Sequence, residues 1–326
     1  MVRAWDGAIR VLVKKPWRIP AIFVALPLLA AVPACRKEPG TGRVAEAGPI
    51  RRPEGPLTLE QATRFVVDLV NHDRATFGLP AVDWDETAGR GGQVHAEDMA
   101  EHGYTAHWGT DGSVPEERYT AAGGTNFVQE NAACFFDGQS RGLDSAPTFT
   151  AVDLEKIEGA FMAEVPPRDG HRKNILTASH RKLGVGLAMP KGVSQACMSQ
   201  EFVDDYGEYA GLPERKGVGD TVSIKGEISA PAKFGAIGIA RIELRHAMSA
   251  AELNATYTYA IPKPFALYSP PGYVTPEPVH VDGNRFSIAV PLSEERKRGR
   301  YEVSVWATLP GSSKLVMVSL RVVTVQ

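Results

Sequence analysis

The sequence predicts a mixed α+β domain followed by an all-β domain. Between about residues 57 and 210, apolar residues recur at three- and four-residue steps, which indicates helices, and short strand-like runs follow them. From Gly211 onward, apolar and polar residues alternate in short runs, which is typical of strands. A chain of 326 residues, 43% of them hydrophobic, is long enough for two domains of about 150 residues each.

The first 35 residues are typical of an export signal. Basic residues dominate as far as Arg18, and an uncharged apolar run from Ile19 to Ala34 follows. The run is shorter than the ~20 residues that span a bilayer and contains several prolines, so a signal peptide is favoured over a transmembrane helix. Small residues before Cys35 resemble a bacterial lipoprotein box. We therefore expect lipidation of Cys35, with simple cleavage as the alternative.

Residues 36–56 form a predicted flexible linker. They are rich in glycine, proline and charge and almost free of apolar side chains. Such a segment buries too little apolar surface to offset the entropy lost on ordering. It would hold the next domain, residues 57–210, away from a membrane.

Capping residues mark the predicted helices of this domain. Thr58 and Gln61 form a capping box at the start of a helix with one apolar stripe. Asp85 is a suitable N-cap for a second helix that runs to about His102, although several glycines weaken it. Gly103 is placed to end that helix. A further helix is predicted over residues 151–163.

The sheet of this domain is predicted from two runs, residues 183–188 and 195–203. The same region contains Cys134 and Cys197, which remain as the only two cysteines downstream of Cys35. Because an exported protein meets an oxidising compartment, we expect them to form a disulfide. Two buried thiols are the alternative.

Four short motifs follow one another in this domain, each with a polar residue suited to a site. Their sequences are Tyr104-Thr-Ala-His107-Trp, Gln129-Glu130-Asn131-Ala132, Phe161-Met-Ala-Glu164 and Asp169-Gly-His171. This ordered set resembles the CAP superfamily, which includes the cysteine-rich secretory proteins, antigen 5, the plant pathogenesis-related 1 proteins and bacterial SCP-like extracellular proteins. The resemblance covers roughly Leu57 to Tyr209 and implies a CAP α-β-α sandwich. Gln129 and Phe161 depart from the family pattern, where Gly and Trp are usual.

The resemblance implies that four residues face one another across a central cleft: His107, Glu130, Glu164 and His171, called here the tetrad. Two imidazoles and two carboxylates are suited to a divalent metal such as zinc. They are equally suited to hold one another as a polar network without metal. The spacing of the four residues leaves both interpretations open.

The other histidines of this domain are expected to be structural or exposed. His95 lies one turn from a methionine on the second predicted helix, so packing is favoured over metal ligation. His72, His102 and His180 are predicted to lie on the surface.

Residues 211–326 are predicted to form an immunoglobulin-like β-sandwich. About seven short alternating runs are present, and Asp282-Gly283 is a hairpin signal between two of them. Nothing in this region gathers catalytic residues. It resembles bacterial surface sandwiches that act as spacers or adhesive modules.

Two functions are consistent with the sequence. We favour an exported, lipid-anchored, non-enzymatic module of the cell envelope whose cleft binds a divalent metal, a lipid or a cell-wall ligand, because no nucleophile or oxyanion-hole motif is recognisable. The alternative is a metal-dependent hydrolase of peptide or glycan bonds, with Glu130 or Glu164 as base. A third possibility, that the C-terminal sandwich binds the partner, also stays open. The net charge of −2 gives no reason to expect a nucleic-acid partner.

Overall fold

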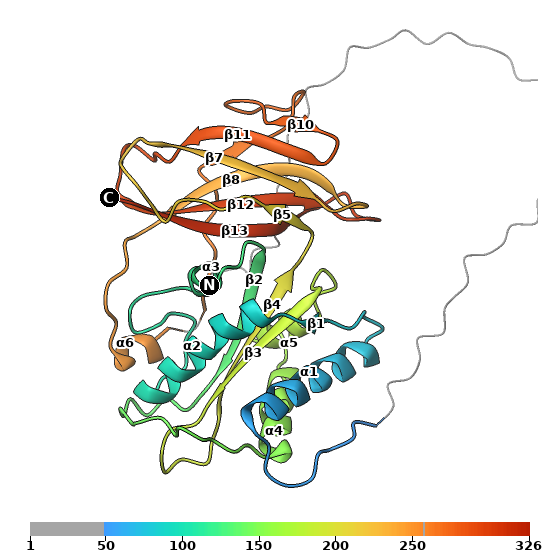
Figure 1. Ribbon diagram of the computed structural model, residues 1–326, viewed down its shortest axis with the longest axis vertical. Coiled ribbons are helices and arrows are strands. Elements are labelled where there is room, and N and C mark those ends of the chain that lie inside the picture. Colours follow the sequence, from blue (N-terminus) through green and yellow to red (C-terminus); the bar gives the residue numbers. More distant parts are fainter. Residues whose placement is uncertain (1–48, 257) are drawn as a thin grey trace, which may run out of the picture.

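The computed structural model describes residues 49–256 and 258–326 (Figure 1). The expected signal peptide of residues 1–35, the lipidation of Cys35 and residues 36–48 of the expected linker lie outside the described residues. Within the described ranges, no helix combines the length and the apolar character needed to cross a membrane.

The described chain has helices and strands in its N-terminal part and mostly strands in its C-terminal part. The N-terminal elements are α1 (Leu59–Thr76), β1 (Asp83–Trp84), α2 (Glu86–His102), α3 (Pro115–Ala121), β2 (Phe127–Ala133), α4 (Ala151–Met162), α5 (Gly170–Ile175), β3 (Lys182–Ala188) and β4 (Cys197–Asp204). The C-terminal elements are β5 (Gly207–Tyr209), β6 (Arg215–Lys216), β7 (Thr221–Ile228), β8 (Lys233–Ile242), α6 (Ala250–Asn254), β9 (Ala266–Tyr268), β10 (His280–Asp282), β11 (Arg285–Pro291), β12 (Gly299–Thr308) and β13 (Leu315–Val325).

The N-terminal part is a three-layered α-β-α arrangement (Figure 1). Its central sheet has the strand order β1-β3-β4-β2, with β4 antiparallel to both β3 and β2. The helices α2 and α3 cover one face, and α1, α4 and α5 cover the other. This confirms the mixed α/β character expected from the sequence.

The two faces of β3 carry different residues. Leu183, Val185 and Leu187 point into the apolar core beneath α1 and α4. The intervening Gly184 and Gly186 lie against α2, where a Cβ on Gly184 would come within 2.1 Å of a backbone nitrogen. On α2, a Cβ on Gly92 would lie 3.3 Å from the backbone nitrogen of Gly186, so this glycine, one of those that weakened the helix prediction, allows the close approach of helix and strand.

The predicted caps are confirmed. The Thr58 hydroxyl accepts from the Gln61 backbone N–H at 3.3 Å, and the Gln61 side chain accepts from the Thr58 N–H at 3.0 Å. Asp85 caps α2 by accepting from the Ala88 N–H at 2.8 Å. Gly103 ends α2 in the left-handed conformation, with φ of 66°.

The C-terminal part consists of two sheets that pack face to face. One has the order β10-β11-β7-β5 and the other the order β6-β13-β12-β8-β9. Apolar residues from both sheets form one buried core, including Ile224, Ile288 and Val303. This part is β-rich and not purely β, because the short helix α6 lies in the connection between β8 and β9.

Polar and apolar contacts join the two parts. Phe127 of β2 packs in a cluster with Trp306 and Leu320 of the C-terminal part. The Arg300 guanidinium donates to the carboxylate of Glu117 at 2.5 Å, and both side chains are almost fully buried. The β-rich part is therefore seated directly on the edge strand β2 and on α3.

Candidate functional site

The first half of the tetrad is the pair His107–Glu130. His107 lies in the loop after α2, and its Nδ1 donates to Glu130 Oε1 at 2.8 Å. Glu130 lies in the middle of β2, and its side chain is buried completely. Gln129, where the sequence departs from the family pattern, is an ordinary residue of the extended strand. The edge strand of the sheet therefore fixes the orientation of His107.

The second carboxylate oxygen of Glu130 also has partners. Arg118 of α3 donates to Glu130 Oε2 at 2.7 Å, and Ser199 of β4 lies 3.2 Å from the same atom. Burial by itself raises the pKa of Glu130, but His95 and Arg118 outweigh it and hold the pKa well below its usual range. Burial and the charge of Arg118 also lower the pKa of His95, to about 4. The cation that faces Glu130 at neutral pH is therefore the Arg118 guanidinium.

A second buried carboxyl lies opposite Glu130 in the sheet. Glu201 of β4 is the antiparallel partner of Glu130, and both residues are buried. Two charges of the same sign directly opposite each other are destabilising. Burial first and Glu130 second raise the pKa of Glu201 well above its usual range. Glu201 is therefore the protonated member and Glu130 the ionised member of this pair.

The second half of the tetrad is the pair Glu164–His171. His171 lies in the first turn of α5, and its Nδ1 donates to Glu164 Oε1 at 2.6 Å. Glu164 Oε2 accepts the backbone N–H of His171 at 2.9 Å. The ring of Phe161 lies 4.6 Å from the imidazole of His171, centroid to centroid, and limits its rotation. The glutamate thus holds both the side chain and the backbone of its histidine.

The edge strand β2 connects the two pairs. Neighbouring side chains on a strand point to opposite faces, so Asn131 lies on the face opposite Glu130. Asn131 donates to the backbone carbonyl of His171 at 3.2 Å and accepts from Asn174 at 3.0 Å. Two consecutive residues of β2 therefore position the two histidines from opposite faces of one sheet.

The prediction that His180 lies on the surface is wrong. His180 is 1% exposed; its Nδ1 is 2.7 Å from Asp204 and its Nε2 is 2.9 Å from Asn174. It therefore extends the Asn131–Asn174 network into the core. His72 and His102, also expected on the surface, are half-buried, whereas His95 is packed inside as predicted.

The tetrad is arranged as two separate pairs. Both oxygens of each glutamate accept hydrogen bonds within their own pair or from its neighbours. Among residues 49–256 and 258–326, no group of three or more His, Cys, Asp or Glu side chains is arranged to hold a metal ion. Because each Nδ1 carries the proton donated to a carboxylate, the Nε2 of His107 and of His171 is the ring atom left for a ligand. The side chains of these histidines are 22% and 30% exposed, which leaves both accessible.

Cys134 and Cys197 form a disulfide in the structure. Cys134 directly follows β2, and Cys197 begins the neighbouring strand β4. The disulfide therefore cross-links β2 and β4, the two strands that carry Glu130 and Glu201, at one end of their pairing.

Similarity to known proteins agrees with this geometry. Residues 67–202 match the sequence model of the CAP family, described as the cysteine-rich secretory protein family. The chain contains a CAP domain. All four residues of the tetrad lie within the matched range.

Two solved structures resemble parts of the chain. One is an extracellular protein with an SCP domain from Bacillus anthracis str. Ames, with 24% identity over 47% of this chain and 45% of that protein, and a TM-score of 0.34. The other is an outer surface protein from Borrelia burgdorferi, with 14% identity over 45% of this chain and 96% of that protein, and a TM-score of 0.35. The chain thus spans less than half the length of the Bacillus protein. No curated protein matches it.

The C-terminal part contributes a residue next to the CAP-domain histidine. Tyr259, from the connection between β8 and β9, lies 6.5 Å from the His107 ring and 5.1 Å from the Trp108 ring, centroid to centroid. Its hydroxyl donates to Glu116 of α3. Sequence reasoning missed this residue, since nothing near Tyr259 in the chain marks it as a neighbour of His107.

The same connection is anchored firmly on the CAP domain. Asn254 accepts from the Thr105 N–H at 3.0 Å, two residues before His107, and Leu253 packs beside Met99 and Tyr104. Met248 N–H donates to the Thr110 carbonyl at 2.8 Å. The loop that carries His107 is thus held from the C-terminal side as well as by β2.

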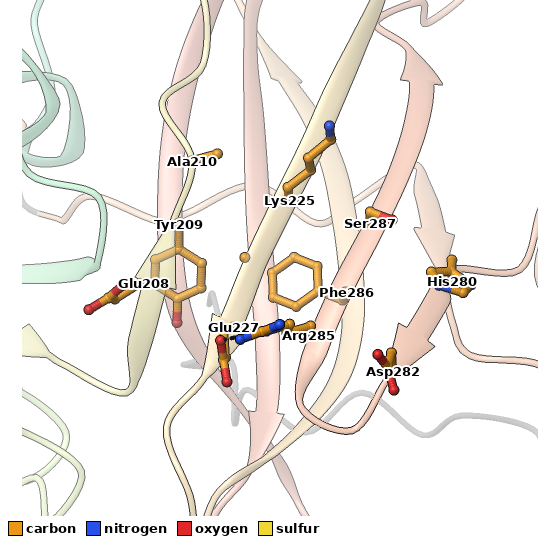
Figure 2. Close-up of a pocket in the computed structure, with 11 residues that line it drawn as sticks. Glu208, Tyr209, Ala210, Lys225, Glu227, His280, Asp282, Arg285, Phe286 and Ser287 are labelled. Atoms are coloured by element: carbon orange, nitrogen blue, oxygen red, sulfur yellow. Dashed lines mark hydrogen bonds and ion pairs between the residues drawn. The ribbon is translucent and has the colours of Figure 1, made fainter.

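A pocket in the described part of the chain lies elsewhere. It has a volume of about 590 Å³ and lies on the outer face of the sheet β10-β11-β7-β5 (Figure 2). Charged side chains surround it, and Arg285 donates to Glu227 across two of its strands at 2.9 Å. None of the tetrad residues lines it, so we place the candidate site at the histidine pairs.

Proposed function

We propose that this chain is an exported CAP-domain protein of the cell envelope that binds a ligand through His107 and His171 and performs no catalysis. The basic and apolar segment before Cys35 supports export, and so does the secretory family to which the CAP domain belongs. Lipidation of Cys35 would attach the protein to a membrane. The linker of residues 36–56 would then set the distance between the membrane and the CAP domain.

The observation that carries the proposal is the pairing of each histidine with its own glutamate. A metal-binding histidine commonly donates its second ring N–H to a carboxylate, which fixes its tautomer and orientation. His107 and His171 both have this arrangement. The Nε2 of each histidine is therefore oriented for a divalent ion such as zinc, with Glu130 and Glu164 as orienting groups rather than ligands. A lipid or cell-wall ligand with hydrogen-bond donors would use the same two atoms.

A metal-dependent hydrolase remains the second candidate for one reason. Two protein ligands would leave positions on the metal open, and a catalytic zinc needs an open position for water. The engaged oxygens of Glu130 and Glu164 argue against either residue as a general base, because each would first have to give up its present hydrogen bonds.

We further propose that residues 211–326 are an immunoglobulin-like sandwich whose role is to support the binding site. Tyr259 and Asn254 contact the loop that carries His107. These contacts favour a C-terminal part that is held in place beside the site over one that acts as an independent adhesive module.

The proposal is tested by zinc calorimetry on the purified protein. We expect saturable binding that weakens by at least tenfold in His107→Ala and in His171→Ala, and that weakens as the pH is lowered because protons compete for imidazole nitrogen. His72→Ala is the control, because His72 belongs to neither pair, and should leave the affinity unchanged.

Activity measurements separate the two candidates. Turnover of a peptidoglycan or peptide panel that depends on zinc and on both histidines would replace the binding module with the hydrolase. Binding of zinc, of membrane fractions and of cell-wall fractions is measured for the unmodified protein and the two histidine variants. If none of these bindings depends on His107 and His171, the tetrad is a structural network.

A further inference from the structure

The junction between the CAP domain and the C-terminal part contains two buried carboxyl groups, Glu116 of α3 and Glu302 of β12, called here the acidic pair. Each is only 1% exposed. They lie where α3 meets the sheet that contains β12 and β13 (Figure 1). One member comes from each part of the chain, so the pair forms only when the two parts are in contact.

The cations at this junction are bonded to other groups. Arg300 of β12 donates to the carboxylate of Glu117 at 2.5 Å. Arg245, in the connection between β8 and β9, pairs with Asp111 at 2.7 Å and with Glu117 at 3.3 Å. In the described part of the chain, neither guanidinium forms a salt bridge with the acidic pair. A second negative charge on the pair would therefore lack a bonded counter-ion.

Glu302 is the member of the pair that carries a proton. Neither of its carboxyl oxygens has a hydrogen-bond partner in the described part of the chain, so no donor stabilises a charge on it. Burial first and the neighbouring Glu116 second raise the pKa of Glu302 to about 10. The Glu116 carboxylate, in contrast, accepts from the Tyr259 hydroxyl, which favours charge on Glu116.

The acidic pair is connected to the candidate site through the segment between β8 and β9. Tyr259 of this segment donates to Glu116 and lies 6.5 Å from the His107 ring, centroid to centroid. Asn254 of the same segment accepts from the Thr105 N–H at 3.0 Å. Opening of the junction would therefore remove both residues from the loop that carries His107.

We propose that the C-terminal part is held on the CAP domain by a proton-dependent contact between Glu116 and Glu302. While Glu302 carries a proton, the pair has at most one negative charge and the junction stays closed. When Glu302 loses this proton, two carboxylates face each other in a buried space and repel, which opens the junction. Tyr259 and Asn254 then leave the loop that carries His107, and this release requires no ligand.

The direction of the pH dependence follows from the protonated member. The closed junction raises the pKa of Glu302, so the contribution of the acidic pair is full below the usual value of 4.5. It is lost as the pH rises toward the pKa of the closed state. Since opening releases one proton, each pH unit in this window weakens the closed junction by up to about tenfold.

Hydrogen exchange of the Thr105 N–H tests the proposal, because this N–H donates to Asn254 across the junction. The Val82 N–H is the matched reference, since it donates to the Asn71 side chain at 2.8 Å within the CAP domain. NMR on the purified protein gives the exchange rate of each N–H relative to an unfolded peptide at the same pH. From pH 6 to pH 9, we expect the protection of Thr105 to fall at least tenfold and that of Val82 to stay unchanged.

Variants assign the effect to the acidic pair. Glu302→Gln keeps the size of the side chain and cannot ionise, so Thr105 should stay protected up to pH 9. Glu227→Gln is the matched control, because this glutamate has a side chain that is 53% exposed on β7 of the C-terminal part, and it should keep the fall in protection. If Glu302→Gln does not fold, Glu116→Gln decides in the same way, since it removes the other charge.

Three results would overturn the proposal. Protection of Thr105 that does not change between pH 6 and pH 9 would show that the junction holds without the proton. An equal fall in Glu302→Gln, or in Glu116→Gln where that variant is used, would place the titrating group elsewhere. An equal fall at Val82 would mean that the whole domain unfolds rather than the junction.

Discussion

The paired carboxyls Glu130 and Glu201 allow a sharp test, because the same substitution should have opposite consequences at the two positions. Glu130→Gln replaces an ionised group whose oxygens bind His107 at 2.8 Å and Arg118 at 2.7 Å. The amide would point its NH₂ at one of these donors and leave the buried Arg118 without its anion. Breaking a buried ion pair in this way costs about 3–5 kcal/mol.

Glu201→Gln should be nearly neutral or stabilising. Since Glu201 is protonated in the folded state, the amide keeps its size, its uncharged state and an acceptor for Ser199, which lies 2.8 Å away. We expect a change in the free energy of unfolding within about 1 kcal/mol at pH 5.

The two positions also differ in their pH dependence. The pKa of Glu130 is lowered by folding, so its contribution to stability is present above the usual value of 4.5 and is lost as the pH falls toward the folded pKa. The pKa of Glu201 is raised by folding, so its contribution is full below 4.5 and is lost as the pH rises toward the folded pKa. Glu201→Gln should therefore gain stability relative to the unmodified protein between pH 5 and pH 8.

Urea unfolding of the two variants and the unmodified protein at pH 5, 6.5 and 8 provides the measurement. Equal destabilisation by both variants, or a stability difference for Glu201→Gln that does not change with pH, would refute the assignment of the charge to Glu130.

Further predictions concern the core, the disulfide and the anchor. His180→Ala should lower the free energy of unfolding by about 2–4 kcal/mol, measured by urea titration, because it leaves the buried Oδ1 of Asp204 without its partner; a change below about 0.5 kcal/mol would contradict the buried placement. Thiol titration of the unfolded, unreduced domain should find neither Cys134 nor Cys197 free. Reduction of the disulfide should lower the free energy of unfolding by about 4 kcal/mol, because the unfolded chain regains the entropy of the closed loop. Cys35→Ser should move the protein from the membrane fraction to the soluble exported fraction, and equal partitioning of both proteins would exclude lipidation.

Local signals in the sequence determined much of the N-terminal fold. The capping box of Thr58, the N-cap Asp85 and the terminating Gly103 were predicted correctly, because a cap depends on atoms within a few residues of it. The hairpin signal Asp282-Gly283 likewise marked the turn between the antiparallel strands β10 and β11. The motifs around His107 and His171 located the candidate site, because their residue types and order are visible without a structure.

The environment of these residues was decided only by the tertiary structure. The register of β2 and β4 places Glu130 opposite Glu201, and no local pattern specifies which residues of two distant strands face each other. His180 was predicted to be exposed because two basic residues follow it in the sequence. In the folded chain it is buried and hydrogen-bonded to Asp204.

Two further features depend on contacts between segments far apart in the chain. Tyr259 reaches His107 because the C-terminal part is seated on β2 and α3, a contact between residues about 150 positions apart. The tetrad could be named from the sequence, but its division into two histidine–glutamate pairs could not. That division results from the pleat of β2, which directs Glu130 and Asn131 to opposite faces of the sheet.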